Sequence, residues 1–426
     1  MIILADPVFV INGKQKMDGE IVVSGSKNSA LPILIGSILC SGEVTIKNCP
    51  NLSDTDNVLK ILQTIGCSVK KQKTSRGSSV TINPAGIKTS IIAKDLMEEM
   101  RASVLFLAPL VKLFGLCKLA KPGGCKIGSR PIDLHIKALR YLGVDVVEED
   151  EFITAKSEKI ISGDKVYLPF PSVGATENTI LTAVCAVGET IIYNPAAEPE
   201  IEDLINFLNK CGAKIHICGD GSILIKGVQK LSGCVYEIIP DRIVATTFIG
   251  CVAAAGGSVC LRKADINHLS GVLPFFQKSG CEIKGFSKDI VVSRKGSIKS
   301  AGFVKTDPYP GFPTDAQAIL MSNMAIAKGN TTFYETIFEN RYNHVSQLRK
   351  MGANIDYFDR VAYVTGVKNL HGAVVSSPDL RGGVALVVAA LCAEGETKIE
   401  NIKYILRGYD SLEKSLSQCG LNIMKK

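Results

Sequence analysis

Residues 138–146 read ALRYLGVDV, in which apolar side chains at helical spacing are followed by a glycine and then by an alternating strand. This pattern is typical of a helix whose last turn closes on a glycine in the left-handed region and leads directly into a strand. Similar stretches occur at five other places in the chain. They read ILQTIGCSV (61–69), FLNKCGAKI (207–215), FFQKSGCEI (275–283), QLRKMGANI (347–355) and SLSQCGLNI (415–423).

The glycines of these stretches are nearly evenly spaced, at 66, 143, 212, 280, 352 and 420. A second mark, a glycine followed by an alternating strand, lies upstream of each of them, at 42, 115, 188, 257, 329 and 395. A helix, a glycine and a strand also recur by chance in α/β proteins, but two marks at one period favour a repeat. The sequence therefore predicts six copies of a βαβ-like unit. Six copies of about 70 residues suggest two halves of three, with a boundary near 230–240 and a ligand cleft between them.

The composition excludes several classes of protein. Hydrophobic residues make up 46% of the 426 residues and charged residues 21%, as in ordinary proteins with an aliphatic core. The 49 Lys and Arg against 41 Asp and Glu give a charge of +8 that is not gathered into a basic tract, so we expect a small anionic ligand and no nucleic acid.

The cysteines and the apolar runs indicate a compartment. The 14 cysteines include no C-x-x-C pair, so we expect neither a zinc site nor a disulfide framework, but a reduced, cytoplasmic protein. The first residues, MIILADP, lack a basic leader, and the longest apolar run, 384–393, is about half a membrane span. We therefore expect neither secretion nor membrane insertion.

Two segments combine small residues with cations. Residues 23–34, VSGSKNSALPIL, lead from a strand into a helix, where backbone N–H groups and Lys27 could bind an oxyanion. An ordinary strand-to-helix turn with a solvated lysine is the alternative. Residues 121–131, KPGGCKIGSRP, place Cys125 among glycines and cations, a setting that favours a reactive thiol, although such a cysteine can also be silent.

The C-terminal half offers an acid and three arginines at the ends of expected elements. Asp315 lies near the start of a helix, where it is either a cap or a general base. Arg341, Arg381 and Arg407 are either surface residues or planar forks for a carboxylate or a phosphate.

Ten motifs, in this order, resemble those of the enolpyruvyl transferases over residues 21–423. They are SGSKNSALPIL (24–34), MRAS (100–103), PGGCKIGSRPIDLHI (122–136), SVGAT (172–176), EPEI (198–201), PDR (240–242), FPTDAQA (312–318), FENR (338–341), DLR (379–381) and RGY (407–409). The loop with Cys125 and the following RPIDLH is similar to that of the members that use UDP-N-acetylglucosamine. The shikimate-using members lack this loop.

The resemblance implies an α/β fold, a two-domain inside-out α/β barrel in which each domain has three βαβαββ units. It implies one lobe over 25–236, which carries the Cys125 loop as a lid over the substrates, and a second lobe made of 1–24 and 237–426. The implied reaction transfers the enolpyruvyl group of phosphoenolpyruvate to the 3-hydroxyl of UDP-N-acetylglucosamine and releases phosphate. This reaction starts peptidoglycan precursor synthesis, needs no cofactor or metal and is the target of fosfomycin.

The resemblance also implies residue roles. Lys27, Arg130 and Arg407 would surround the phosphate of phosphoenolpyruvate, with Asn28 nearby, and Arg341 and Arg381 would lie near its carboxylate. Asp315 would be the base at the sugar hydroxyl, and Cys125 the general acid, able to form a covalent adduct. The implied contacts to UDP-N-acetylglucosamine are Asn28, Arg101, Arg130, Pro131, Ile132, Asp133, Leu134, Ser172, Val173, Gly174, Asp315 and Ile337.

Three positions differ from the family pattern. Phe170 replaces a lysine before Ser-Val-Gly, Val244 an acid after Asp-Arg-Ile, and Leu406 an aspartate before Arg-Gly-Tyr. None has a role in the chemical step, but they bear on the affinity for the nucleotide sugar and on the closure of the lobes. Phe170 could instead stack on the uracil ring. Two alternatives therefore stay open: a degenerate paralogue that binds a nucleotide sugar with little turnover, and a transferase for another acceptor alcohol such as shikimate 3-phosphate.

Overall fold

The computed structural model describes residues 6–74, 77–123, 127–157 and 161–426. These residues form two compact units, which we describe separately. The terminal unit contains residues 6–23, 127–130 and 240–426, and the central unit contains residues 24–123 and 131–239. The chain therefore passes between the units at 23/24 and at 239/240, and residues 127–130 return to the terminal unit from within the central stretch.

The terminal unit has three four-stranded sheets, ordered β15-β16-β14-β2, β17-β18-β20-β19 and β21-β22-β1-β23. Its strands are β1 (Phe9–Asn12), β2 (Met17–Val22), β14 (Gly257–Arg262), β15 (Cys281–Phe286), β16 (Asp289–Arg294), β17 (Phe303–Lys305), β18 (Asn330–Tyr334), β19 (Asn354–Phe358), β20 (Val361–Thr365), β21 (Val374–Ser376), β22 (Glu396–Glu400) and β23 (Ile423–Lys425). Its helices are α8 (Arg242–Ala255), α9 (Leu273–Lys278), α10 (Thr314–Met324), α11 (Val345–Lys350), α12 (Leu380–Cys392) and α13 (Leu412–Gln418), with the 3₁₀ turns η4 (Ile266–Leu269) and η5 (Ile405–Arg407).

The central unit also has three sheets, ordered β13-β3-β5-β4, β11-β12-β10-β9 and β6-β8-β7. Its strands are β3 (Val44–Cys49), β4 (Ser68–Thr74), β5 (Gly77–Asn83), β6 (Leu116–Ala120), β7 (Asp145–Glu148), β8 (Phe152–Lys156), β9 (Lys165–Tyr167), β10 (Glu189–Tyr193), β11 (Lys214–Ile217), β12 (Ile223–Lys226) and β13 (Val235–Glu237). Its helices are α1 (Lys27–Gly36), α2 (Ser53–Ile65), α3 (Lys94–Glu98), α4 (Leu107–Phe114), α5 (Asp133–Tyr141), α6 (Val173–Ala183) and α7 (Pro199–Lys210), with the 3₁₀ turns η1 (Ser37–Leu39), η2 (Pro84–Gly86) and η3 (Arg101–Phe106).

Each sheet belongs to one βαβαββ repeat, which is complete in the run β17, α10, β18, α11, β19, β20. The first two strands of this run are parallel, with Val304 opposite Phe333, and the others pair antiparallel. Parallel neighbours need a crossover connection, and α10 supplies it. All six predicted glycines have positive φ, between 80° and 116°, which allows each repeat to turn from its second helix into a strand.

Two repeats take their first strand from a distant part of the chain. β13 pairs parallel with β3, and β2 pairs parallel with β14. In the β6-β8-β7 repeat, a single bridge between Ile91 and Lys118 stands in place of the first strand. The last repeat is completed by β1, which lies between β22 and β23. β2 and β13 end directly before the crossings at 23/24 and 239/240, so these two connections need no separate linker.

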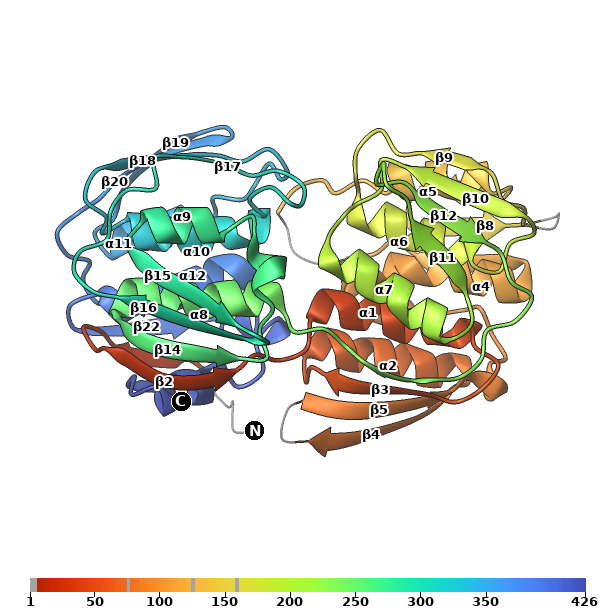
Figure 1. Ribbon diagram of the computed structural model, residues 1–426, viewed down its shortest axis with the longest axis horizontal. Helices are drawn as coiled ribbons and strands as arrows, with labels where there is room; N and C mark the ends of the chain where they lie inside the picture. Colours follow the sequence, from red (N-terminus) through yellow and green to blue (C-terminus); the bar gives the residue numbers. More distant parts are fainter. Residues whose placement is uncertain (1–5, 75–76, 124–126, 158–160) are drawn as a thin grey trace. The chain divides into compact units, whose positions relative to one another are not determined.

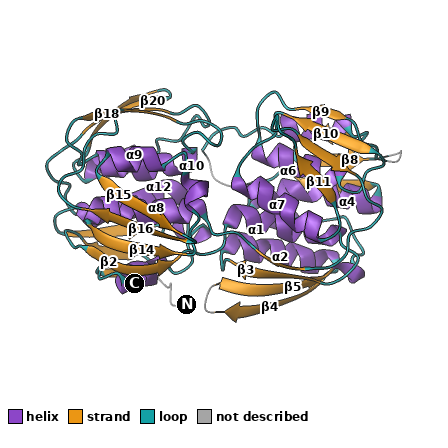
Figure 2. Ribbon diagram, in the orientation of Figure 1, coloured by secondary structure: helices purple, strands orange, loops and turns teal. Residues whose placement is uncertain are grey.

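The helices that follow the first strands lie inside each unit, and the sheets lie outside. Every residue of α12 is buried, as expected for a helix that is apolar on all sides, and α8, α10 and α12 contact one another. In the β18 strand, Thr331 and Phe333 point inward while Asn330 and Tyr334 are exposed. Figure 1 and Figure 2 show helices surrounded by strands in both units. The predicted inside-out α/β fold with three repeats per domain is confirmed.

Helix length also bears on membrane insertion. In the described part of the chain, no helix is both long enough and apolar enough to cross a bilayer.

The contact between α8 and α10 predicts the effect of one added methyl group. Gly250 lies inside α8, and a Cβ added there would be 2.4 Å from Cγ2 of Ile319 on α10. We expect Gly250→Ala to lower the free energy of unfolding by about 1–3 kcal/mol, because a packed core does not accommodate an extra methyl without strain. Urea denaturation measures this change. Gly219→Ala, with no neighbouring atom within 4 Å, is the control and should stay within about 0.5 kcal/mol of wild type.

Candidate functional site

A carboxylate held by two arginines lies at the start of α10. Asp315 is in the first turn of this helix, and its Oδ2 accepts a hydrogen bond of 2.8 Å from Nη2 of Arg381. Its Oδ1 accepts one of 2.5 Å from Nη2 of Arg341, whose guanidinium also donates to the Thr314 carbonyl. The side chains of Arg341 and Arg381 are 3% and 6% exposed, whereas that of Asp315 is 28% exposed. Asp315 is therefore the exposed member of this cluster, and the two guanidiniums that hold it are oriented and nearly buried.

Arg381 is oriented by a chain of hydrogen bonds. Its Nη1 donates to the hydroxyl of Tyr409 over 3.2 Å, and that hydroxyl bonds Oγ1 of Thr247 over 2.7 Å. Asp379 caps α12 by accepting from the backbone N–H of Arg381 and of Gly382. Burial opposes the charge on Arg381, but Asp315, Tyr409 and Asp241 together raise the pKa of its guanidinium above the ordinary value. The guanidinium is thus charged and fixed in direction.

Glu335 ties the start of α10 to the segment that carries Arg341. It is fully buried, and its Oε2 accepts from the hydroxyl of Thr314 over 3.0 Å. Its Oε1 accepts from the backbone N–H groups of Ile337 and Phe338. The sequence reasoning missed this residue. The sequence signal that could have identified Glu335 is its position, which is directly after an alternating strand and shortly before FENR.

His344 lies beside Arg341 and the first turn of α12. The sequence reasoning missed this residue as well. It is fully buried, and neither ring nitrogen reaches hydrogen-bonding geometry with the protein, although the Arg341 carbonyl is near enough to affect its pKa. A Cβ on Gly382 would lie 3.0 Å from its Cβ, which places the imidazole against the first turn of α12. Burial lowers the pKa of His344 to about 4, the Asp379 carboxylate raises it in part, and the Arg341 cation lowers it further.

In the central unit, Lys27 is the first residue of α1 and is held by an acid. Its Nζ donates to Oδ2 of Asp54 over 3.2 Å, and both side chains are largely buried. Ser26 caps the helix by accepting from the N–H of Ser29. A cation at the positive end of a helix is unfavourable, and the Asp54 carboxylate offsets this effect. Asp54 was not predicted, although an acid in the first turn of α2 is visible in the sequence.

The structure brings together two of the segments predicted to bind the nucleotide sugar. Residues 131–134 lead into α5, and Ser172 caps α6 by accepting from the N–H of Ala175. His135 on α5 bonds the amide of Asn178 on α6 over 2.8 Å. A Cβ on Gly174 would lie 2.7 Å from Cε1 of His135, so only a glycine allows this approach.

In the terminal unit, two of the predicted site arginines lie near the ring of Phe338. The guanidinium carbons of Arg130 and Arg341 lie 5.4 and 5.8 Å from the centre of its ring. Arg407 ends η5 and is partly buried. Asn28 and Arg101, on α1 and η3, are also partly buried.

The proposed acid, Cys125, lies outside the described residues. Ten of the thirteen cysteines in the described ranges are buried. Burial raises the pKa of Cys49 to about 12 and that of Cys281 to about 11, which suits small apolar side chains and not reactive thiols.

The three positions that differ from the family pattern have different surroundings. Phe170 is 43% exposed, Val244 is buried in the first turn of α8, and Leu406 is in η5.

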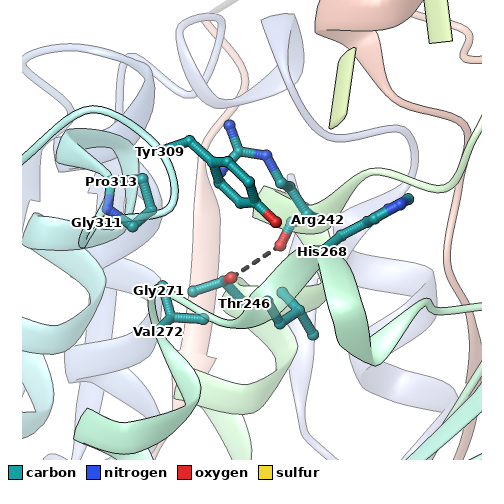
Figure 3. Close-up of a pocket in the computed structure, with 9 residues that line it drawn as sticks. Arg242, Thr246, His268, Gly271, Val272, Tyr309, Gly311 and Pro313 are labelled. Carbon is teal, nitrogen blue, oxygen red and sulfur yellow. Dashed lines mark hydrogen bonds between the residues drawn. The ribbon is translucent and has the colours of Figure 1, made fainter. Parts of the chain in front are cut away.

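A small pocket borders the start of α10, as Figure 3 shows. The guanidinium of Arg242 lies over the ring of Tyr309, 5.4 Å from its centre, and Oγ1 of Thr246 donates to the Arg242 carbonyl. Pro313, drawn beside Gly311 at the left of Figure 3, directly precedes α10. None of the residues predicted from the sequence as site residues lines this pocket.

Sequence comparisons give one family and a consistent set of relatives. The family model described as EPSP synthase (3-phosphoshikimate 1-carboxyvinyltransferase) matches residues 11–416. The chain is 44% identical to UDP-N-acetylglucosamine 1-carboxyvinyltransferase 2 of Caldanaerobacter subterraneus subsp. tengcongensis, over 98% of this chain and 99% of the relative. It is 42% identical to UDP-N-acetylglucosamine 1-carboxyvinyltransferase 1 of Clostridium acetobutylicum, over 97% and 98%.

Solved structures share the fold at lower identity. The enolpyruvyl transferase NikO from Streptomyces tendae superposes with a TM-score of 0.89 at 20% identity, over 99% of both chains. EPSP synthase from Acinetobacter baumannii superposes with a TM-score of 0.78 at 18% identity, over 99% of this chain and 100% of that one.

The buried imidazole predicts a dependence of stability on pH. The pKa of His344 is about 4 in the folded protein and about 6.5 when unfolded, so the unfolded state binds more protons between these values. Stability should therefore fall as the pH falls, with His344 contributing a loss of about 2 kcal/mol between pH 7 and pH 5. Urea denaturation at pH 7 and at pH 5 measures the free energy of unfolding. The loss between the two pH values should be smaller in His344→Gln than in wild type by about 2 kcal/mol.

The control for this comparison is His371→Gln, because the His371 side chain is 66% exposed. It should keep the wild-type pH dependence. An equal loss in wild type and His344→Gln would contradict a neutral buried imidazole, and His344→Asn serves if the glutamine variant does not fold.

Proposed function

Because the chain belongs to the EPSP synthase (3-phosphoshikimate 1-carboxyvinyltransferase) family, we propose that it is a carboxyvinyl transferase that acts on phosphoenolpyruvate and UDP-N-acetylglucosamine. The acceptor is inferred from the names of relatives at 42–44% identity over nearly the whole chain. The geometric observation that carries the proposal is Asp315 between Arg341 and Arg381. The product would enter peptidoglycan precursor synthesis, and fosfomycin would be an inhibitor.

The proposed reaction requires a base, an acid and cations. Asp315 takes the proton of the sugar 3-hydroxyl while the hydroxyl oxygen attacks C2 of phosphoenolpyruvate. Cys125 donates a proton to the methylene carbon. The resulting tetrahedral ketal then returns a proton from this methyl carbon to the Cys125 thiolate and expels phosphate, which restores the double bond. Arg341 and Arg381, which already converge on Asp315, suit the substrate carboxylate. Lys27, Asn28, Arg130 and Arg407 are assigned to the phosphate side.

The proposed acceptor site follows the segments that the central unit brings together. Residues 131–134 and 172–174 lie at the starts of two neighbouring helices, whose first N–H groups suit the oxygens of a nucleotide sugar. The remaining proposed contacts are Asn28, Arg101, Arg130, Asp315 and Ile337. We propose a cytoplasmic enzyme with lobes over 25–236 and over 1–24 with 237–426.

The proposal is tested by phosphate release from phosphoenolpyruvate by the purified protein. The reaction is run with UDP-N-acetylglucosamine, with shikimate 3-phosphate and with neither acceptor. We expect release only with UDP-N-acetylglucosamine. If phosphate is released only with shikimate 3-phosphate, the acceptor is a different alcohol. If the protein is folded and binds UDP-N-acetylglucosamine but releases no phosphate, the result supports a degenerate paralogue.

The acceptor assignment predicts the effect of Gly174→Ala. The added methyl would lie 2.7 Å from Cε1 of His135 and would displace the start of α6. We expect KM for UDP-N-acetylglucosamine to rise roughly tenfold, as the loss of about 1.4 kcal/mol of binding energy would produce, with KM for phosphoenolpyruvate within about twofold. Steady-state kinetics measure both constants. Gly219→Ala is the control, and an unchanged KM for the sugar would remove 172–174 from the acceptor site.

A further inference from the structure

Phe338 is an aromatic residue whose ring is approached by two cations. The guanidinium carbon of Arg130 lies 5.4 Å from the ring centre, and that of Arg341 lies 5.8 Å from it. Both distances are within the range in which the negative face of an aromatic ring attracts a cation. The two arginines come from segments more than 200 residues apart in the chain.

The ring is held in place by the backbone on both sides of it. The N–H of Phe338 donates to Oε1 of Glu335, and the N–H of Asn340 donates to the Ile127 carbonyl over 3.0 Å. The second bond joins the segment that ends at Arg130 to the segment that carries the ring.

Two further contacts fix the same junction. Glu339 is paired with Arg360, and Gly128 lies so close to the Glu339 carboxylate that a Cβ there would be 2.1 Å from Oε2. The backbone that carries the Phe338 ring is therefore held by several independent contacts.

An aromatic partner has one property that a carboxylate lacks. Two guanidiniums that converge on a substrate anion repel each other, and a carboxylate that relieves this repulsion also occupies their N–H donors. A ring face attracts the cation through its quadrupole and leaves the N–H donors at the edge of the guanidinium available. Arg341 already donates to Asp315 and Thr314, so a second, non-competing partner is useful at this position.

We propose that Phe338 is a positioning residue for phosphoenolpyruvate, which orients Arg130 and Arg341 toward this anion through its π face. The inference rests on the proposed function, because the anion is the substrate assigned there. It deepens that function by giving a role to Phe338, the first residue of the FENR motif, to which the resemblance assigns none. Phe338 acts through the two arginines and not on the reacting atoms.

The test compares Phe338→Leu, which keeps apolar bulk without a π face, with Phe338→Tyr, which keeps the aromatic face. We expect Phe338→Leu to raise KM for phosphoenolpyruvate roughly tenfold, as the loss of two partly desolvated cation–π contacts implies. KM for UDP-N-acetylglucosamine, which Arg130 is also proposed to contact, should rise less. Phe338→Tyr should stay within about twofold of wild type. Phe358→Leu, at a phenylalanine that is 85% exposed in the same unit, is the control and should change nothing.

Titration calorimetry with inorganic phosphate and with phosphoenolpyruvate separates this inference from the proposed function. If wild type turns over and the leucine and tyrosine variants have equal KM values, the inference is wrong and the function stands. If wild type does not turn over, weaker phosphate binding by Phe338→Leu than by Phe338→Tyr still supports the positioning role, and equal binding overturns it. If Phe338→Leu does not fold, Phe338→Met takes its place.

Discussion

The burial of apolar helices inside each unit is the constraint on which the other features depend. A helix such as α12, with every residue buried, cannot shift without opening the core, because protein interiors are close-packed. Its first turn is therefore a fixed point, and so is that of α10, which it contacts. Asp315 and Arg381 stand on these two first turns. The core thus determines the geometry of the charged cluster, although the cluster residues themselves are polar.

Buried charges at these helix starts are stable only because their partners are fixed as well. An isolated buried guanidinium is costly, and removing its carboxylate leaves an uncompensated charge. Asp315 compensates two arginines, Glu335 connects the backbone around them, and Tyr409 with Thr247 orients the second one. The neutral state of His344 completes the arrangement, since a protonated imidazole would add another positive charge beside Arg341. Polar residues without a proposed chemical role therefore decide how the arginines are presented.

The pairing of β2 and β13 with strands that are distant in the chain has a different origin from the rest of the fold. Five sheets are four-stranded, yet β2 and β13 are far in sequence from the helices that follow them in their repeats. Local periodicity identifies a strand but carries no information about which distant strand pairs with it. For this reason the six glycine marks predicted the repeats, whereas the places of β2, β13 and β1 emerged only from the pairing.

By itself the sequence determined the six repeats, because these depend on local periodicity. Its contiguous motifs determined the resemblance to a family, and this resemblance implied the inside-out α/β class. The sequence also named Asp315, Arg341 and Arg381 separately, and their chemical roles stay predictions. Only the tertiary structure placed these three side chains in contact and revealed Glu335, His344 and Phe338 around them. The physical reason is that hydrogen bonds and cation–π contacts between residues distant in the chain are set by how the helices pack, and one sequence carries no local signal for such neighbours.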